Sequence, residues 1–269
     1  MSKQPPQIKS TDVFYKDRVF NIEYFYRQGE KRDNCITART GRAKENYYEA
    51  CKSPALTSHT LLFFDNPGTG NSTYFEDYPL NIDDLTEISS LFIKQLGISN
   101  FILCGTSMGG LTSLLYLNHE PGKVKAYINI EGNLLPEDCM FSSKVVSYDF
   151  ETFASQVFPK TISDMKENGN TGYHIIANNL QLNTNIKSYY NYSFQTVEYS
   201  STGELLAQFK ALKIPMLFIY GEENNSLSYI PELRKSGMTV KEISNSNHFI
   251  FYDNPKELYE VIGDFINEI

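Results

Sequence analysis

A serine, a histidine and several carboxylates in this sequence have the types and positions that nucleophilic catalysis requires. Ser107 stands in the segment GTSMG (105–109), between the apolar segments FILC and LTSLLYL. A serine hydroxyl is a weak nucleophile at neutral pH, so it needs a neighbouring base that takes its proton. His248 ends the polar segment NSNH (245–248), and an imidazole titrates near neutral pH, as a general base must. We therefore predict that Ser107 is a nucleophile and His248 its base.

The Gly-x-Ser-x-Gly pattern is weak evidence by itself, because glycine and serine are common enough that it arises by chance on the order of once in ten chains of this length. The alternative is a serine in an ordinary tight turn. Here the pattern follows an apolar strand and precedes a helical segment, which is the strand, sharp turn and helix of a nucleophile elbow. Flanking glycines give such a turn the space it needs. The helix that follows directs the Met108 N–H towards a developing oxyanion.

The other three histidines occupy less suitable positions. His59 precedes an apolar strand, His119 ends the helical segment after Ser107, and His174 lies in a long polar stretch. Each of them is interpreted as a surface or packing residue.

The elements that position these residues follow from hydrophobic periodicity. Short apolar runs at 60–64, 101–104, 124–130 and 215–220, with a shorter strand near 239–243, alternate with helical segments. This alternation indicates βαβ units on a mostly parallel sheet of the α/β class. Residues 13–28 form two aromatic and β-branched stretches around a polar turn, so a hairpin is expected there. Helix-capping patterns begin helices after Asn81 and after Asn254.

The stretch 135–208 interrupts the alternation. It is polar, rich in asparagine and tyrosine, and helical in places. We predict that it is a cap or lid inserted into a core formed by residues 1–134 and 209–269. The aromatic run YYNYSF (189–194) in this stretch either packs inside the cap or lines a substrate pocket.

Composition narrows the function classes. Hydrophobic residues make up 41 % and charged residues 21 %, near globular averages, and the formal charge is −8. A net negative charge opposes binding to a phosphate backbone, so nucleic acid is not expected as a partner. No segment approaches the roughly 18 apolar residues of a membrane span, and no apolar leader is recognised, so a cytoplasmic location is expected. The four cysteines lack metal-ligand spacing, so no metal is expected.

Four segments together resemble the α/β-hydrolase superfamily, and the resemblance extends from about residue 13 to 269. They are DNPGTGNS (65–72), like the loop after the fourth strand; GTSMGG (105–110), like the elbow; IPMLFIYGE (214–222), like the penultimate strand; and SNSNHFIFYDNP (244–255), like the histidine loop. The resemblance implies the α/β-hydrolase fold, a mostly parallel central sheet flanked by helices with an inserted helical cap. It also implies a small-molecule substrate, no cofactor, and His248 as the base.

The sequence leaves open which residue is the acid that supports the histidine. The family usually has an aspartate three residues after the glycine that ends the penultimate strand, but Asn224 stands at that position. An asparagine orients an imidazole without balancing its charge, and a comparable change in a serine protease costs roughly 10⁴ in rate. Glu131 ends the strand VKAYINI, where some branches of the superfamily place the acid, and is preferred. Glu222, Glu223 and Asn224 are the alternatives.

The segment expected to supply the second oxyanion donor also differs from the family's usual sequence. Its usual His-Gly pair is replaced by Arg39-Thr40-Gly41. A backbone N–H needs no particular side chain, so Thr40 or Gly41 is expected to donate together with Met108. Arg39, or Arg42 nearby, either forms a structural ion pair or binds a substrate carboxylate in bidentate fashion.

The function expected from these residues is acyl transfer to water: a serine hydrolase that cleaves a small carboxylic ester with Ser107, His248 and Glu131. One alternative is a carbon–carbon hydrolase of the meta-cleavage type, whose elbow is similar to Ser-Met-Gly-Gly. A second is a retired hydrolase that acts as a ligand-binding receptor or scaffold, since fold alone does not decide function. The sequence does not determine the oligomeric state.

Overall fold

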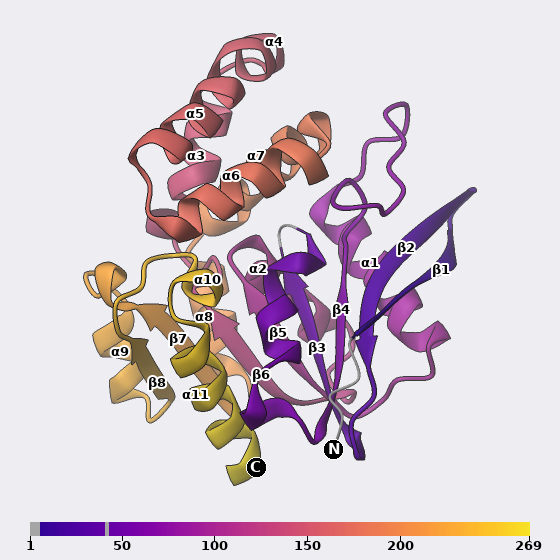
Figure 1. Ribbon diagram of the computed structural model, residues 1–269, viewed down its shortest axis with the longest axis vertical. Coiled ribbons are helices and arrows are strands. Elements are labelled where there is room, and N and C mark those ends of the chain that lie inside the picture. Colours follow the sequence, from indigo (N-terminus) through magenta and orange to yellow (C-terminus); the bar gives the residue numbers. More distant parts are fainter. Residues whose placement is uncertain (1–5, 41–42) are drawn as a thin grey trace.

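A single eight-stranded sheet organises the chain, and the computed structural model describes residues 6–40 and 43–269. The strands lie in the order β1-β2-β4-β3-β5-β6-β7-β8 (Figure 1). The pairs β1/β2 and β2/β4 are antiparallel, whereas every pair from β4 to β8 is parallel. The strands are β1 (Gln7–Tyr15), β2 (Arg18–Arg27), β3 (Lys31–Thr40), β4 (His59–Phe64), β5 (Phe101–Thr106), β6 (Val124–Ile130), β7 (Met216–Gly221) and β8 (Thr239–Ile243).

The strand sequences explain their places in the sheet. Every residue of β4 and β5 is buried, as expected for apolar runs that are covered by helices on both faces of a parallel sheet. Strand β1 is largely exposed and lies at the edge. It forms with β2 the expected hairpin, which turns at Lys16 with a φ of 52°.

Helices cover both faces of the sheet. One face packs against α1 (Ile82–Gln95), α2 (Met108–His119), α8 (Glu204–Ala211) and α9 (Ile230–Lys235). The other face packs against the 3₁₀ helix η1 (Lys44–Cys51) and α11 (Pro255–Glu268). The capping patterns act as expected: Asn81 and Asp84 form a capping box at α1, and the Asn254 side chain accepts from Glu257 N–H at α11.

A helical layer between β6 and β7 lies over one end of the sheet (Figure 1). It comprises the 3₁₀ turn η3 (Pro136–Asp138), α3 (Met140–Val146), α4 (Phe150–Thr152), the π-helical turn η4 (Phe153–Val157), α5 (Phe158–Asn168), α6 (Thr171–Asn183) and α7 (Ile186–Ser201). Helix α8 then runs across the position where the sequence places the cap boundary, 208/209. The division into core and cap stays a prediction.

The loop after β4 ties this helical layer to the sheet. Gly70 N–H donates to Asn183 C=O at 2.7 Å, and Asn185 N–H donates to Gly68 C=O at 3.0 Å. Gly68 and Gly70 have positive φ values of 87° and 53°, which glycine adopts without steric cost. The tight loop therefore holds the junction between α6 and α7.

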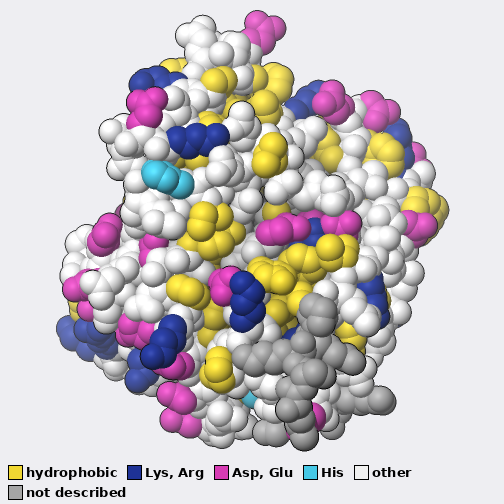
Figure 2. All heavy atoms as spheres, viewed as in Figure 1, with side chains coloured by type: hydrophobic (Ala, Val, Ile, Leu, Met, Phe, Trp, Pro, Cys, Tyr) yellow, Lys and Arg dark blue, Asp and Glu magenta, His cyan; other side chains and the backbone are white. Residues whose placement is uncertain are grey.

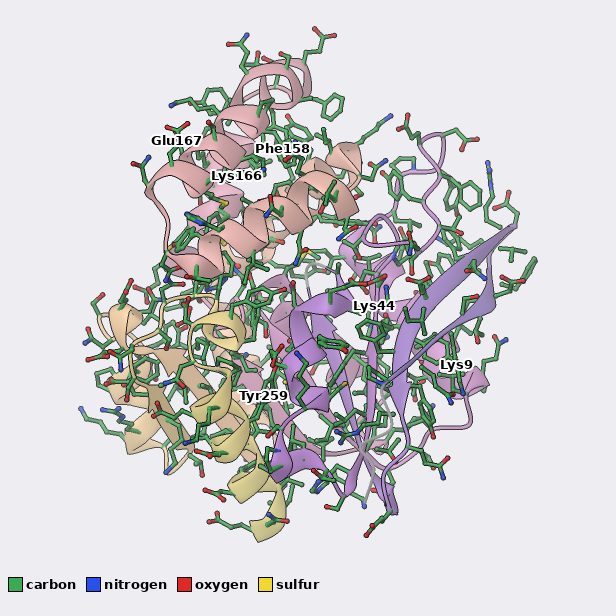
Figure 3. The ribbon with its side chains drawn as sticks, viewed as in Figure 1. Lys9, Lys44, Phe158, Lys166, Glu167 and Tyr259 are labelled. Atoms are coloured by element: carbon green, nitrogen blue, oxygen red, sulfur yellow. The ribbon has the colours of Figure 1, made fainter. Side chains whose placement is uncertain are left out.

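A buried ion cluster lies at the start of the same loop. The Lys44 side chain is inside the fold, whereas Lys9 and Lys166 are at its periphery (Figure 3). Lys44 Nζ lies 2.9 Å from Asp65 Oδ2 and also pairs with Glu23 and Glu45. Lys44 N–H donates to Asp65 Oδ1 at 2.6 Å, so one carboxylate holds both ends of this lysine.

The surface carries charges of both signs. On the face shown in Figure 2, acidic and basic side chains are interspersed and hydrophobic side chains lie between them. Within residues 6–40 and 43–269, no helix has both the length and the apolar character needed to cross a membrane.

Candidate active site

Ser107 occupies the turn between β5 and α2. Its backbone has φ 54° and ψ −130°, a conformation that costs a non-glycine residue of the order of 1–3 kcal/mol and that is concentrated at functional sites. Hydrogen bonds maintain the turn: Ser107 N–H donates to Ile130 C=O at 3.3 Å, and Gly110 N–H donates to Ser107 C=O at 2.8 Å. Ser107 thus sits at the carboxyl end of β5, where open α/β sheets bind their ligands.

Glycines allow the chain to pack closely around this turn. A Cβ at Gly105 would lie 2.4 Å from Gly109 O, inside any permitted contact. A Cβ at Gly110 would lie 2.4 Å from the Cα of Gly132, which follows β6. The helix after Ser107 therefore lies directly against the segment after β6, and both positions require glycine.

His248 lies in the loop between β8 and α10 (Ile250–Asp253) and is 5 % exposed. The Asp253 carboxylate accepts from Asn247 N–H at 3.1 Å and from the Asn170 side chain at 3.0 Å, so it joins this loop to α6. Burial raises the pKa of Asp253 above its usual value. The imidazole packs against the Phe141 ring, with a centroid distance of 5.9 Å.

The remaining histidines are elsewhere. His59 is buried in β4, His119 is exposed at the end of α2, and His174 is exposed on α6.

Glu131 follows β6 and is 4 % exposed. Its Oε2 lies 2.6 Å from His248 Nδ1. Its Oε1 accepts from Gly221 N–H at 2.7 Å, and the Asn224 amide donates to both carboxylate oxygens at 2.9 Å. Donors that favour the ionised carboxylate therefore surround a buried group whose desolvation would otherwise be costly.

The alternative acids lie beyond the end of β7. Asn224 occupies the position at which the family usually has its aspartate, and it donates to Glu131. Glu222 is exposed and its Oε2 accepts from Asn245 N–H at 2.7 Å. Glu223 is exposed too and lines a groove on the far side of the histidine loop. Among the carboxylates in the described part of the chain, Glu131 is the one hydrogen-bonded to His248.

The structure describes the backbone of two expected oxyanion donors, Met108 and Thr40. Met108 is the first residue of α2, where backbone N–H groups have no partner inside the helix and point out of its end. Thr40 ends β3 and is paired with Thr106, the residue before Ser107. Gly41 and Arg42 lie outside the described residues, as do the side chains of Arg39 and Thr40.

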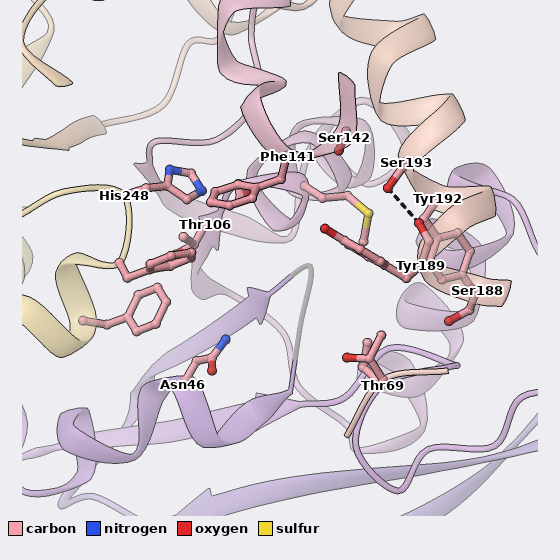
Figure 4. A pocket seen from close by; sticks show the side chains of 15 residues that line it. Asn46, Thr69, Thr106, Phe141, Ser142, Ser188, Tyr189, Tyr192, Ser193 and His248 are labelled. Carbon is pink, nitrogen blue, oxygen red and sulfur yellow. Dashed lines mark hydrogen bonds between the residues drawn. The ribbon is translucent and has the colours of Figure 1, made fainter. Parts of the chain in front are cut away.

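Ser107, Met108 and His248 line one cavity of about 50 Å³ beneath the helical layer (Figure 4). Its other walls come mainly from the loop after β4, η1, α10 and the helices α3 and α7. The residues are Asn46, Thr69, Thr106, Phe141, Ser142, Thr184, Ser188, Tyr189, Tyr192, Ser193, Phe249 and Phe251. None of these described lining residues is a lysine, arginine, aspartate or glutamate.

Hydroxyl groups on the cavity wall are bonded to the protein itself. Tyr192 O–H donates to Pro67 C=O at 3.0 Å, and Ser193 O–H donates to Tyr189 C=O at 2.7 Å. Burial raises the pKa of Tyr192 well above its ordinary value, so the phenol is neutral at physiological pH. These bonds fix the wall that faces Ser107.

Sequence reasoning did not single out Asn46 or Phe141, although both line the cavity. Asn46 Oδ1 accepts from Tyr252 O–H at 3.0 Å, 206 positions away, which no local pattern reveals. Phe141 lies in the segment that the sequence assigns to the cap, where nothing marks one aromatic residue above another. Tyr189 and Tyr192 line the cavity, whereas Tyr190 and Phe194 contact each other edge to face, so the aromatic run both lines the cavity and packs on itself.

Metal ligands are not grouped in the part of the chain that the structure describes: no cluster of three or more His, Cys, Asp or Glu side chains is suited to an ion.

The chain matches the family described as the alpha/beta hydrolase fold over residues 40–255, and it belongs to this family. A Xanthomonas euvesicatoria serine O-succinyltransferase is 39 % identical over 70 residues, which are 25 % of this chain and 17 % of that protein. A Mycoplasma genitalium protein described as an esterase/lipase is 22 % identical over 78 % of this chain and 83 % of its own. A carboxylesterase structure from Nitrososphaera gargenis superposes with a TM-score of 0.76 at 15 % identity, covering 96 % and 98 % of the two chains.

The family match supports a hydrolase, and the eight-stranded sheet with flanking helices is the α/β-hydrolase fold. At 15 % identity the structural neighbour defines the fold alone.

Proposed function

We propose that this protein is a serine hydrolase that cleaves a small, uncharged carboxylic ester through Ser107, His248 and Glu131. One observation carries the proposal: His248, held at Nδ1 by the Glu131 carboxylate at 2.6 Å, lines the same cavity as Ser107 on its elbow. A nucleophile, a base and a group that orients the base recur together in hydrolases of unrelated folds.

The reaction has two halves. The Ser107 Oγ attacks the ester carbonyl while His248 Nε2 takes its proton, and the carbonyl oxygen becomes an oxyanion. The backbone N–H of Met108, with a second N–H at Thr40 or Gly41, stabilises that charge. His248 gives the proton to the alcohol oxygen, whose bond to the carbonyl carbon breaks. Water then loses a proton to His248 and attacks the acyl carbon. The bond from this carbon to Ser107 Oγ breaks, and His248 returns the proton to Ser107.

Glu131 keeps Nδ1 of the imidazole protonated, so that Nε2 faces the serine with its lone pair. The carboxylate also stabilises the imidazolium that forms while the proton is on His248. Asn224 has a different role from Glu131, because its amide donates to the Glu131 carboxylate and holds it in place.

The cavity supports a short acyl portion without a charge. A volume of about 50 Å³ has room for a few water molecules or a short acyl group. A charged group would have to enter between neutral side chains without a counter-ion among the described lining residues, which is unfavourable in a buried site.

A fluorophosphonate probe tests the proposal directly. The probe phosphonylates an activated serine, so we expect one adduct on Ser107 in the folded wild type and none in Ser107→Ala. His248→Ala should label at least 100-fold more slowly, because the base is gone. Ser113→Ala is the matched control, since Ser113 is buried on α2 outside the cavity. A folded wild type that stays unlabelled would reject the serine hydrolase and favour a retired, ligand-binding protein.

A further inference from the structure

A second cavity lies beside the catalytic one. It is a groove of about 580 Å³ between α3, α5, the start of α6 and the loops that carry Glu223 and Asn247. It is larger and more open to the surface than the cavity that contains Ser107. Asn247 is the neighbour of His248 in the chain, so the groove opens on the histidine side of the site.

One side chain, Phe141, lines both the groove and the catalytic cavity. Its ring lies 5.9 Å from the His248 ring and 5.7 Å from the Phe249 ring on the catalytic side. On the groove side it lies 6.5 Å from the Tyr173 ring. Figure 4 shows the Phe141 ring beside the imidazole of His248. Phe141 therefore forms a wall between the two spaces.

Ester cleavage requires space for the alcohol portion of the substrate near the imidazole. His248 must give its proton to the alcohol oxygen, so the alcohol portion of the substrate lies next to the imidazole. The catalytic cavity, at about 50 Å³, does not hold an acyl group and a bulky alcohol together. The larger space on the histidine side of the site is the groove, which the Phe141 ring separates from the imidazole.

The lining of the groove indicates what it binds. Met140, Met165 and Tyr173 give it an apolar surface, and Met140 is 50 % exposed at its rim. Thioether and aromatic side chains adapt well to flat apolar groups. Asn168 and Asn170 add amide groups, and Lys144, Asp164 and Glu223 add charged groups to the lining.

We infer that the groove is the alcohol subsite of the proposed esterase, that it takes the aryl or bulky alkyl portion of the leaving alcohol, and that Phe141 sets the width of the passage from Ser107. This inference rests on the proposed function. It separates the two halves of the substrate: a short acyl group beside Tyr189 and Tyr192, and a larger alcohol beyond Phe141.

Phe141→Ala tests the passage. Two ester series are compared: acetates of methanol, phenol and 2-naphthol, and phenyl esters of acetate, butyrate and hexanoate. We expect Phe141→Ala to raise the kcat/KM ratio of naphthyl acetate to methyl acetate on the order of 10-fold, the size that one pocket contact typically has. The preference among acyl chains should change less than 2-fold. Phe141→Leu, which keeps an apolar side chain, should give an intermediate ratio and covers the case in which alanine impairs folding.

A filling variant tests the groove itself. Asn168 is exposed at the end of α5, and Asn168→Trp in the Phe141→Ala background should reverse most of the gain for naphthyl acetate by occupying the groove. Leu182→Ala is the matched control, because Leu182 is 78 % exposed on α6 and lines neither space.

The outcomes separate this inference from the proposed function. If Phe141→Ala changes both ester series equally, or mainly the acyl series, while Ser107 still reacts with the fluorophosphonate probe, the alcohol subsite is wrong and the serine hydrolase stands. If Ser107 does not react in the wild type, both are wrong.

Discussion

Two buried carboxylates stand at the carboxyl ends of strands in this sheet, and they differ in the partner that each one faces. Asp65, after β4, is fully buried and binds the ammonium of Lys44. Glu131, after β6, is equally enclosed but binds the imidazole of His248. An ammonium stays charged across the physiological range, whereas an imidazole gains and loses its proton near neutral pH. A partner that is always charged, such as an ammonium, suits a structural ion pair, whereas an imidazole suits proton transfer.

The donors around each carboxylate fit this difference. Glu131 accepts from Gly221 N–H and from the Asn224 amide in addition to the imidazole, so it stays in place whichever protonation state His248 has. Asp65 shares one ammonium with Glu23 and Glu45. Burial lowers the pKa of Lys44, but the three carboxylates outweigh burial and its pKa is raised. Each single carboxylate receives only part of that charge, so burial raises the pKa of Asp65 to about 6 despite Lys44.

The largest expected effect is on catalysis at Glu131. Glu131→Gln should lower kcat for p-nitrophenyl acetate by roughly 10⁴, because a neutral amide neither fixes the imidazole tautomer nor balances the imidazolium. Thermal unfolding should show a folded protein, since the side chain keeps its size. Glu222→Gln and Glu223→Gln are the matched controls and should retain activity within about 2-fold. Full activity in Glu131→Gln would remove Glu131 from the proposed triad.

The next effect is on stability at Lys44. Lys44→Met keeps the length of the side chain but leaves Asp65 buried without its cation, and breaking a buried pair in this way costs about 3–5 kcal/mol of unfolding free energy. Urea denaturation at pH 7.5 measures the loss. Lys52→Met is the control, because Lys52 pairs with Glu49 on the surface and should cost less than about 1 kcal/mol. Equal losses in the two variants would contradict the structural role of the Lys44 cluster.

The smallest effect is the pH dependence that Asp65 contributes. A carboxyl group whose pKa is raised in the folded state stabilises the protein below its unfolded pKa and loses that contribution as the pH rises through its folded pKa. With a folded pKa of about 6, the unfolding free energy of the wild type relative to Asp65→Asn should fall by about 2 kcal/mol between pH 4 and 7. Urea titrations across this range measure it. A constant difference would mean that Asp65 is ionised throughout.

Local sequence was sufficient to predict much of the fold. The capping residues at Asn81 and Asn254, the apolar strands and the turn at Ser107 each depend on a few neighbouring positions, and the structure has the corresponding elements. The predicted cap boundary at 208/209 does not coincide with the end of an element, because α8 continues through it.

The acid was harder to predict because it depends on which strand ends are neighbours. Glu131 and His248 are 117 positions apart, and they meet because β6 pairs with β7 and β7 with β8, in the registers Ile130 with Ile219 and Gly221 with Ile243. Sequence spacing offers no such register, so Glu131, Glu222, Glu223 and Asn224 all remained candidates. The Lys44 cluster was not predicted at all, since Glu23 and Asp65 reach the lysine from two different strands.

The loop after β4 has a consequence for the order of folding. Its carbonyls at Gly68 and Pro67 accept from Ser188 and Tyr192, which are 120 and 125 positions further along the chain. Contacts of such long range are costly in loop-closure entropy and are made only after nearer pairings have restricted the chain. We therefore expect the contacts between this loop and the helices above the sheet to form late in folding.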